Sequence, residues 1–82
     1  MRLETFINKL HSVGFIQTDT QNWYENYING TSIFVGIMES EIDCLGHILI
    51  EVNYCHDNDE EETEKEYMTT DGAWRAINKL IK

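Results

Sequence analysis

Apolar residues near the start of the chain recur at the spacing of a helix with one buried face. They fall at i, i+3, i+4 and i+7, with one further position continuing the stripe: Leu3, Phe6, Ile7, Leu10 and Val13. Gly14 follows the stripe directly, where a glycine commonly ends a helix and lets the next apolar residue, Phe15, pack back on it. The pattern predicts a helix over 3–13.

A second stripe with helical spacing lies near the end of the chain, and its members are Ala73, Trp74, Ile77, Leu80 and Ile81. Thr69, Thr70 or Asp71 can cap the start of this helix, because their side-chain oxygens accept hydrogen bonds from free backbone N–H groups. The pattern predicts a helix over 71–81.

Between these stripes the apolar residues follow the patterns of strands. The aromatic and β-branched segment 23–28 runs into Asn29-Gly30, a strong hairpin signal because a type I′ turn needs positive φ at both central residues. A two-residue turn sets the pairs Ile28–Thr31, Asn26–Ile33 and Tyr24–Val35. One face of the hairpin then carries Tyr24, Ile28, Ile33, Val35 and Ile37, and the other carries Trp23, Tyr27, Phe34 and Met38.

A third strand is predicted over 45–54, with Ile48, Ile50, Val52 and Tyr54 pointing inward. Leu49 falls on the outward set, near Phe34 or Met38, so we expect an outer apolar patch of Trp23, Tyr27, Phe34 and Leu49. The segment 56–64 is predicted as an acidic loop. Residues 66–68 are either a short edge strand or an extended approach to the last helix.

These elements predict one α+β domain over residues 1–82, in the order α-β-β-β-(β)-α, with both helices on one face of an antiparallel sheet. The periodic apolar positions predict the core, which consists of Leu3, Phe6, Ile7, Leu10, Ile33, Val35, Ile48, Ile50, Trp74 and Ile77.

Charge changes this picture, because the formal net charge of −9 lies in one part of the chain. Residues 39–66 carry eleven acids against Lys65 alone, a net charge of −10, and the remaining parts are nearly neutral. Such a field repels nucleic acid and anionic membranes and attracts basic surfaces. We therefore expect a basic macromolecular partner, with no direct binding of nucleic acid and no binding to membranes.

The apolar runs are far shorter than the roughly 20 residues of a membrane span. The first residues lead into a charged amphipathic pattern without the apolar stretch of a secretory signal. We expect a cytoplasmic protein with reduced thiols, acting in the cytoplasm of the host cell if it is encoded by a phage.

Two patterns suggest metal ligands. Cys44, His47, Cys55 and His56 resemble zinc ligands, but an intervening strand would hold the two cysteines roughly 36 Å apart, too far for one metal ion or one disulfide. Asp57, Asp59 and Glu61 alternate like the start of a calcium loop, but Glu62 stands where that loop needs glycine and Met68 where it needs glutamate. We expect no metal site and no cofactor.

The sequence contains no recognisable nucleophile motif and no glycine-rich phosphate loop, so we expect no enzymatic activity. The acidic stretch has two interpretations. It is either a solvated loop that keeps a small domain soluble, or a set of fixed carboxylates that competes with nucleic acid for a basic groove. In the second case the partner-binding residues are Glu39, Glu41, Asp43, Glu51, Asp57, Asp59, Glu60, Glu61, Glu62 and Glu64.

In its small size, acidic balance, α-β-β-β-α order and lack of a catalytic motif, the chain resembles the small phage-encoded anti-CRISPR and anti-restriction proteins, of which the acidic members mimic DNA. The resemblance implies a non-catalytic inhibitor whose partner is a basic nucleic-acid-binding protein, specifically a CRISPR or restriction nuclease. The alternative function is a structural or homo-oligomerisation domain. It would form a homodimer through the face of Trp23, Tyr27, Phe34 and Leu49, with the acidic loop serving solubility.

Overall fold

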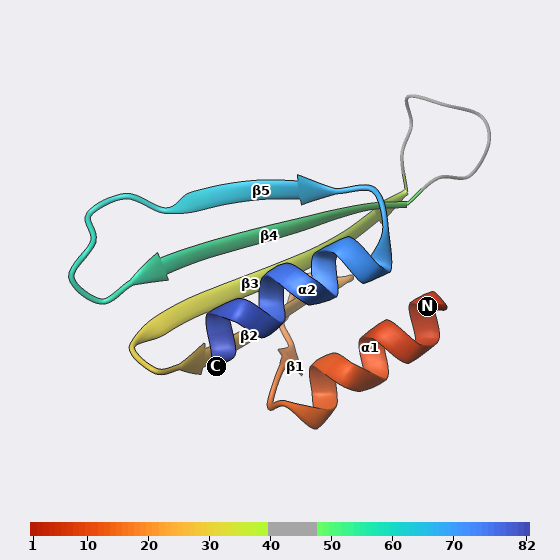
Figure 1. The fold of residues 1–82 in the computed structure, drawn as a ribbon, viewed down its shortest axis with the longest axis horizontal. Coiled ribbons are helices and arrows are strands. Elements are labelled where there is room, and N and C mark those ends of the chain that lie inside the picture. Colours follow the sequence, from red (N-terminus) through yellow and green to blue (C-terminus); the bar gives the residue numbers. More distant parts are fainter. Residues whose placement is uncertain (40–47) are drawn as a thin grey trace.

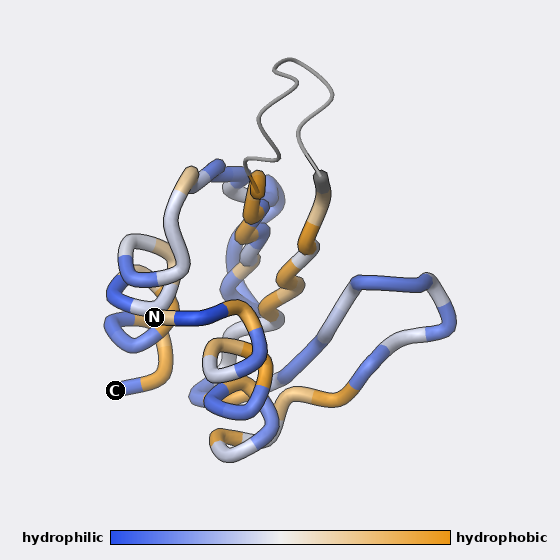
Figure 2. The backbone as a smooth tube through the Cα atoms, turned by 90° about the vertical axis from the view of Figure 1, so that its right-hand side faces the viewer, coloured by the Kyte–Doolittle hydropathy of each residue, from blue (hydrophilic) through white to orange (hydrophobic). Residues whose placement is uncertain are grey.

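The structure is a computed structural model that describes residues 1–39 and 48–82. Within these residues a sheet of five antiparallel strands forms a meander in the order β1-β2-β3-β4-β5 (Figure 1). The strands are β1 (Ile16–Gln17), β2 (Trp23–Ile28), β3 (Thr31–Glu39), β4 (Ile48–His56) and β5 (Thr63–Tyr67). The helices α1 (Leu3–Ser12) and α2 (Thr70–Ile81) lie on the same side of the sheet (Figure 2). The predicted α+β class and the helices on one face are thereby confirmed.

Helix α1 ends as its sequence predicts. Gly14 adopts a φ of 104°, and its N–H donates to the carbonyl of His11 at 3.1 Å. The N–H of Phe15 reaches back to the carbonyl of Leu10 at 2.9 Å, which completes a Schellman motif. The motif turns the Phe15 ring into the core, where only 1% of the residue remains exposed.

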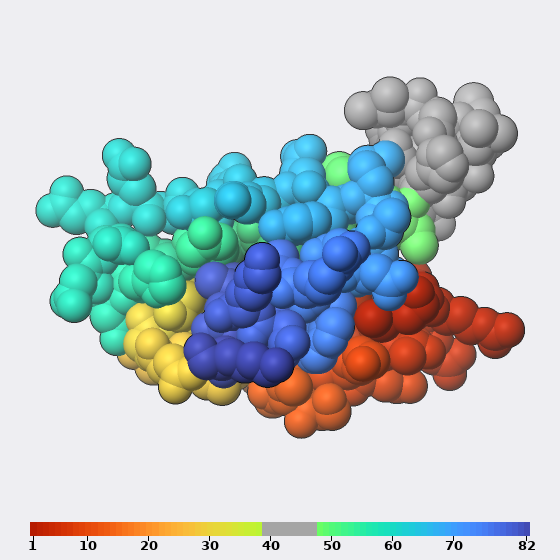
Figure 3. All heavy atoms as spheres, in the orientation of Figure 1, coloured from red at the N-terminus to blue at the C-terminus, as the bar shows by residue number. Residues whose placement is uncertain are grey.

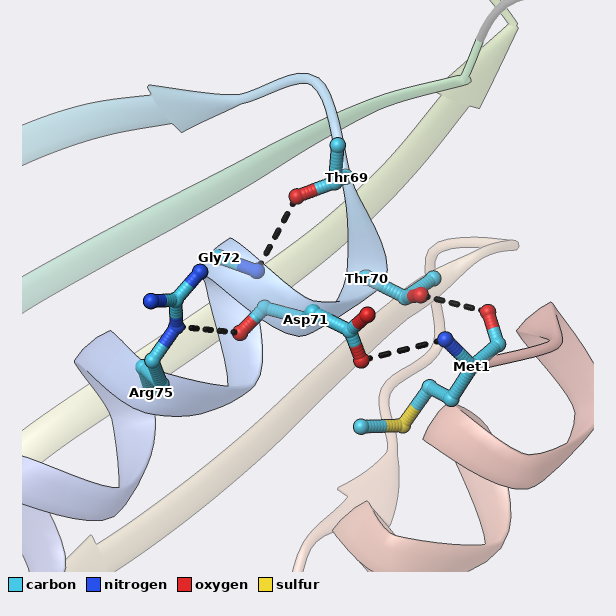
Figure 4. Close-up of polar contacts among 6 residues, drawn as sticks. All are labelled: Met1, Thr69, Thr70, Asp71, Gly72 and Arg75. Carbon is cyan, nitrogen blue, oxygen red and sulfur yellow. Dashed lines mark hydrogen bonds and ion pairs between the residues drawn. The ribbon is translucent and has the colours of Figure 1, made fainter.

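Helix α2 begins one residue before its predicted start, and Thr69 is the residue that caps it. The Thr69 hydroxyl accepts from the N–H of Gly72 at 3.0 Å (Figure 4). The first turn of α2 also holds Met1, whose ammonium group donates to Asp71 Oδ1 at 3.0 Å and whose carbonyl accepts from the Thr70 hydroxyl at 2.6 Å. These contacts join the first residue of the chain to the start of α2.

The β2–β3 hairpin has the predicted turn and register. Asn29 and Gly30 adopt φ angles of 52° and 71°, and Ile28 pairs with Thr31. The pairs Asn26–Ile33 and Tyr24–Val35 follow along the two strands as predicted.

The core lies between the helices and the inner face of the sheet. Six of the predicted core residues are fully buried, namely Phe6, Leu10, Ile33, Val35, Ile50 and Ile77, and Leu3, Ile7, Ile48 and Trp74 pack against them partly buried. Val52, predicted to point inward, is also fully buried, beside its cross-strand partner Val35 on the inner face of the sheet.

Three strands differ from the sequence prediction. Strand β1 was not predicted, since it has two residues and pairs only with Glu25 and Tyr24. Strand β5 begins at Thr63, inside the predicted acidic loop, and β4 continues to His56, so the loop is confined to 57–62. Pairing with β4 outweighs the low β-propensity of the charged residues of β5.

In the described parts of the chain, no helix is long and apolar enough to cross a membrane.

Candidate functional site

The face of the sheet opposite the helices has no element over it in the described structure, and we call it the outer face. Strand alternation places Ile16, Glu25 and Phe34 in one row across β1, β2 and β3. Ile16 is 61% exposed and Phe34 is 36% exposed. Around them lies a shallow hollow of about 360 Å³, also lined by Tyr27. Apolar side chains on this face are therefore accessible to a partner.

Trp23 is the least exposed of the predicted outer aromatic residues. It pairs with Gly36, and a Cβ atom at position 36 would lie 2.5 Å from its ring. The ring therefore lies flat over the glycine, between the β3 positions of Phe34 and Met38. Leu49 pairs with Met38 and is half-buried, so the outer patch consists of exposed Tyr27 and Phe34 joined through Trp23 to a more buried end.

The acidic hairpin, residues 48–67, comprises β4, the loop 57–62 and β5. It holds eight acids against one lysine: Glu51, Asp57, Asp59, Glu60, Glu61, Glu62, Glu64 and Glu66, with Lys65. Its loop projects past the end of α2 at the left of Figure 3. All five loop acids are exposed, as predicted for a surface available to a partner.

The register of β4 and β5 brings acids onto the outer face beside the aromatic patch. Glu51 pairs with Glu66, and Asn53 pairs with Glu64, so all three glutamates share the face that carries Phe34. Residues i and i+2 of a strand lie about 6.6 Å apart, which is the spacing of Glu64 and Glu66 along the edge. The candidate site is this face: an aromatic patch bordered by the carboxylates of Glu51, Glu64 and Glu66.

Among residues 1–39 and 48–82, Asp57 is the one loop acid with hydrogen bonds to another hairpin. The Tyr27 hydroxyl donates to Asp57 Oδ2 at 2.5 Å, and the Asp57 N–H donates to the carbonyl of Gly30 at 2.9 Å. This hydrogen bond to a carboxylate raises the pKa of Tyr27 above its ordinary value, and desolvation and the negative charge of Asp57 add to the effect. The base of the acidic loop is thus fixed to the aromatic patch.

Asn53 lies at the centre of the outer face, between Phe34 and Glu64 in the row of paired residues. It is 7% exposed, and its Nδ2 donates to Glu51 Oε1 at 3.0 Å. Its Oδ1 has no hydrogen-bond partner among residues 1–39 and 48–82. Asn53 orients the Glu51 carboxylate on the outer face.

Glu39, the first of the predicted acids at 39–43, is not brought to the loop. Glu39 is the last residue of β3 and pairs with Ile48 at the start of β4, while the loop follows His56 at the other end. The nine residues of β4 separate these ends by roughly 27 Å. Glu41 and Asp43 lie outside the described residues.

Sequence reasoning did not name two residues of this site. Glu66 belongs to it because β5 is a full strand, and the alternation Thr63-Glu64-Lys65-Glu66-Tyr67 was the available signal. Ile16 belongs to it through β1, for which two residues give no periodic signal.

Of the four possible zinc ligands, the structure describes Cys55 and His56. Cys55 carries a free thiol and His56 Nδ1 is hydrogen-bonded to the Thr31 hydroxyl at 2.7 Å, while Cys44 and His47 lie outside the described residues. Across the segments 1–39 and 48–82, no three His, Cys, Asp or Glu side chains are grouped as metal ligands.

Comparison with known proteins found no matching family model, and neither a curated protein nor a solved structure matches the chain.

Proposed function

We propose that this chain is a non-catalytic binding protein that presents the outer face of its acidic hairpin to a basic, nucleic-acid-binding protein. The observation that carries the proposal is the register of β3, β4 and β5, which aligns Glu51, Glu64 and Glu66 beside exposed Phe34. A merely solvated loop needs neither a row of carboxylates on one face of the sheet nor an exposed aromatic neighbour.

The composition of this face is that of a protein-binding surface. Specific interfaces commonly place aromatic residues at their centre and polar residues at their rim. Tyr27 and Phe34 supply the centre, and the glutamates of the hairpin supply a rim of one sign. Charge of one sign speeds encounter with a basic partner, while the aromatic residues hold it after contact.

The proposed partner class is a defence nuclease, either a CRISPR effector or a restriction enzyme. Such proteins hold DNA in grooves lined by Lys and Arg, which neutralise phosphates. Carboxylates fixed on a small scaffold can occupy the same groove and exclude DNA. The proposed result is inhibition by competition, without any chemical step.

The test is capture of partners from bacterial lysate on the immobilised protein, followed by elution with duplex DNA. We expect DNA to release a basic protein, and higher salt to weaken its binding steeply. Charge-matched variants separate the site from net charge. Glu64→Gln with Glu66→Gln should weaken binding, whereas Glu4→Gln with Asp19→Asn removes two charges elsewhere and should not.

Simultaneous binding of DNA and this protein to the captured partner would contradict the proposal. Equal effects of the two variant pairs would also contradict it, because net charge alone would then explain the attraction to the partner.

Self-association through the outer face is the alternative function. It would bury the aromatic patch, but it would also bring two sets of like-charged glutamates toward each other, which opposes association. The exposure of Tyr27 and Phe34 is the observation that favours it, and sedimentation of the protein and of Phe34→Glu tests it.

A further inference from the structure

A second hollow, of about 400 Å³, lies on the helix side of the molecule between α2 and the β4–β5 hairpin. Among its lining residues are Tyr54, Lys65, Tyr67, Arg75, Lys79 and Leu80. Figure 3 shows the face that carries it, with α2 in dark blue beside the green-to-cyan hairpin. Its volume falls within the range of small-molecule sites, roughly 300–1,000 Å³.

The charge of this hollow is opposite to that of the protein. The whole chain has six Lys and Arg residues, and three of them line the hollow, namely Lys65, Arg75 and Lys79. Within the described parts of the chain, none of these three lies within ion-pair distance of a carboxylate. No acid lines the hollow either, within the same limits.

Strand alternation produces this separation of charge. Lys65 pairs with Val52 and faces the helix side, whereas Glu64 and Glu66 on either side of it face outward. Arg75 and Lys79 are four residues apart on α2, so they lie on one side of the helix and complete the cationic rim. The cations therefore converge although the hairpin as a whole is strongly acidic.

The lining also has an aromatic and apolar part, which a site for a simple inorganic anion would not need. Tyr54 and Tyr67 come from neighbouring strands, and Leu80 from α2 borders the same space. Gly72 also lines this space and adds no side chain to it. A flat ring can stack on such tyrosines while its charged group contacts the cations.

We propose that this hollow binds a small aromatic phosphate of mononucleotide size, with the phosphate at Arg75, Lys79 and Lys65 and the flat base against Tyr54 or Tyr67. A guanidinium fork and two ammonium groups match a doubly charged phosphate. A longer nucleic acid is disfavoured, since strand continuing beyond the hollow would meet the acids of the hairpin. The proposal is independent of the function assigned to the outer face.

The experiment is a titration of the ¹⁵N-labelled protein, followed by amide chemical shifts, with adenosine 5′-monophosphate, adenosine and inorganic phosphate as separate probes. We expect saturable shifts at Lys65, Tyr67 and Arg75 with the monophosphate. Adenosine and inorganic phosphate should each bind about tenfold or more weakly, because each makes only half of the contacts.

Arg75→Gln should weaken binding of the monophosphate by about tenfold, the loss expected for a charge-assisted hydrogen bond. Arg2→Gln removes the same charged group from an exposed position outside the hollow and should leave binding unchanged. If Arg75→Gln lowers the melting temperature, Lys65→Gln serves in its place, since Lys65 is exposed on the edge strand.

Four results would overturn the proposal. One is an absence of saturable shifts around the hollow, and another is an equal loss of binding in Arg2→Gln. The third is inorganic phosphate binding as tightly as the monophosphate, which would leave a plain anion site. The fourth is a single-stranded oligonucleotide, titrated in the same way, binding more tightly than the monophosphate, which would assign the hollow to a polymer.

Discussion

Gly36 is a residue whose importance comes from its neighbour rather than from its backbone. Gly36→Ala should displace the Trp23 ring, because the added methyl group would lie 2.5 Å from it. The expected cost is about 1–2 kcal/mol of unfolding free energy, as for other overpacked sites. In a Trp74→Phe background, tryptophan fluorescence should shift to the red as Trp23 becomes more exposed. Ser32→Ala on the same face of β3 should change neither quantity, and an unshifted Gly36→Ala spectrum would contradict the stacking of Trp23 on the sheet.

The hydrogen bond from Tyr27 to Asp57 predicts a loss of stability at high pH. The pKa of Tyr27 is raised in the folded state, so the folded protein holds this proton more tightly than the unfolded chain does. The resulting stability is fully present below the ordinary tyrosine pKa of about 10 and is lost as the pH rises through the higher folded value. Melting temperatures of the protein and of Tyr27→Phe should therefore differ at neutral pH and converge in strong alkali. A constant difference would show that Asp57 does not hold the proton.

At the scale of elements, local signals predicted α1, α2 and the β2–β3 hairpin. These signals are the glycine after α1, the threonine before α2 and Asn29-Gly30. Each depends only on residues a few positions away, so each can be recognised from the sequence alone. Strand β5 is different, because Glu64, Lys65 and Glu66 are poor strand formers that pair only because β4 offers a partner edge. The same limit applies to the candidate site, since the loop acids were identifiable by charge while their relation to Phe34 depends on register.

The phase of β4 can be tested with two neighbouring residues. Ile50 is fully buried and faces the helices, whereas Leu49 is half-buried on the outer face. Ile50→Ala should cost about 2–5 kcal/mol of unfolding free energy, as expected for a truncated side chain in a packed core. Leu49→Ala should cost distinctly less in the same denaturant titration. A larger cost for Leu49→Ala than for Ile50→Ala would mean that the strand is displaced by one residue, which exchanges its two faces.

At the scale of the whole molecule, charges of opposite sign are sorted to the two sides of one hairpin. The acidic excess could be predicted from the sequence, because it requires only counting the charged residues along the chain. The sequence did not reveal the cationic hollow, because Lys65 and the cations of α2 meet only when the helix packs beside β4 and β5. Composition therefore could not indicate the parts of the surface that depend on long-range packing.

Phe34→Glu distinguishes the proposed function from its alternative. The substitution adds negative charge at an exposed position and should leave the fold intact. If the aromatic patch forms the centre of the interface, binding to a captured basic partner should weaken by about tenfold or more despite the added charge, because charge is trapped against an apolar surface. Phe34→Leu should keep most of the affinity. Stronger binding by Phe34→Glu would indicate attraction by charge alone.

The same variants address self-association. Sedimentation should show a monomer for the unmodified protein if its outer face binds a different partner. A dimer that Phe34→Glu splits would favour homo-oligomerisation through Trp23, Tyr27, Phe34 and Leu49 instead.

The meander has a consequence for the time course of folding. Each strand pairs with its neighbours in sequence, so the sheet grows from short loops whose closure costs little entropy. The chain also contains no proline, and so lacks the slow isomerisation that delays refolding of many proteins. Refolding from denaturant should consequently follow a single exponential on a timescale of roughly milliseconds, with no phase lasting tens of seconds. Such a protein can regain its acidic surface within moments of removal of the denaturant.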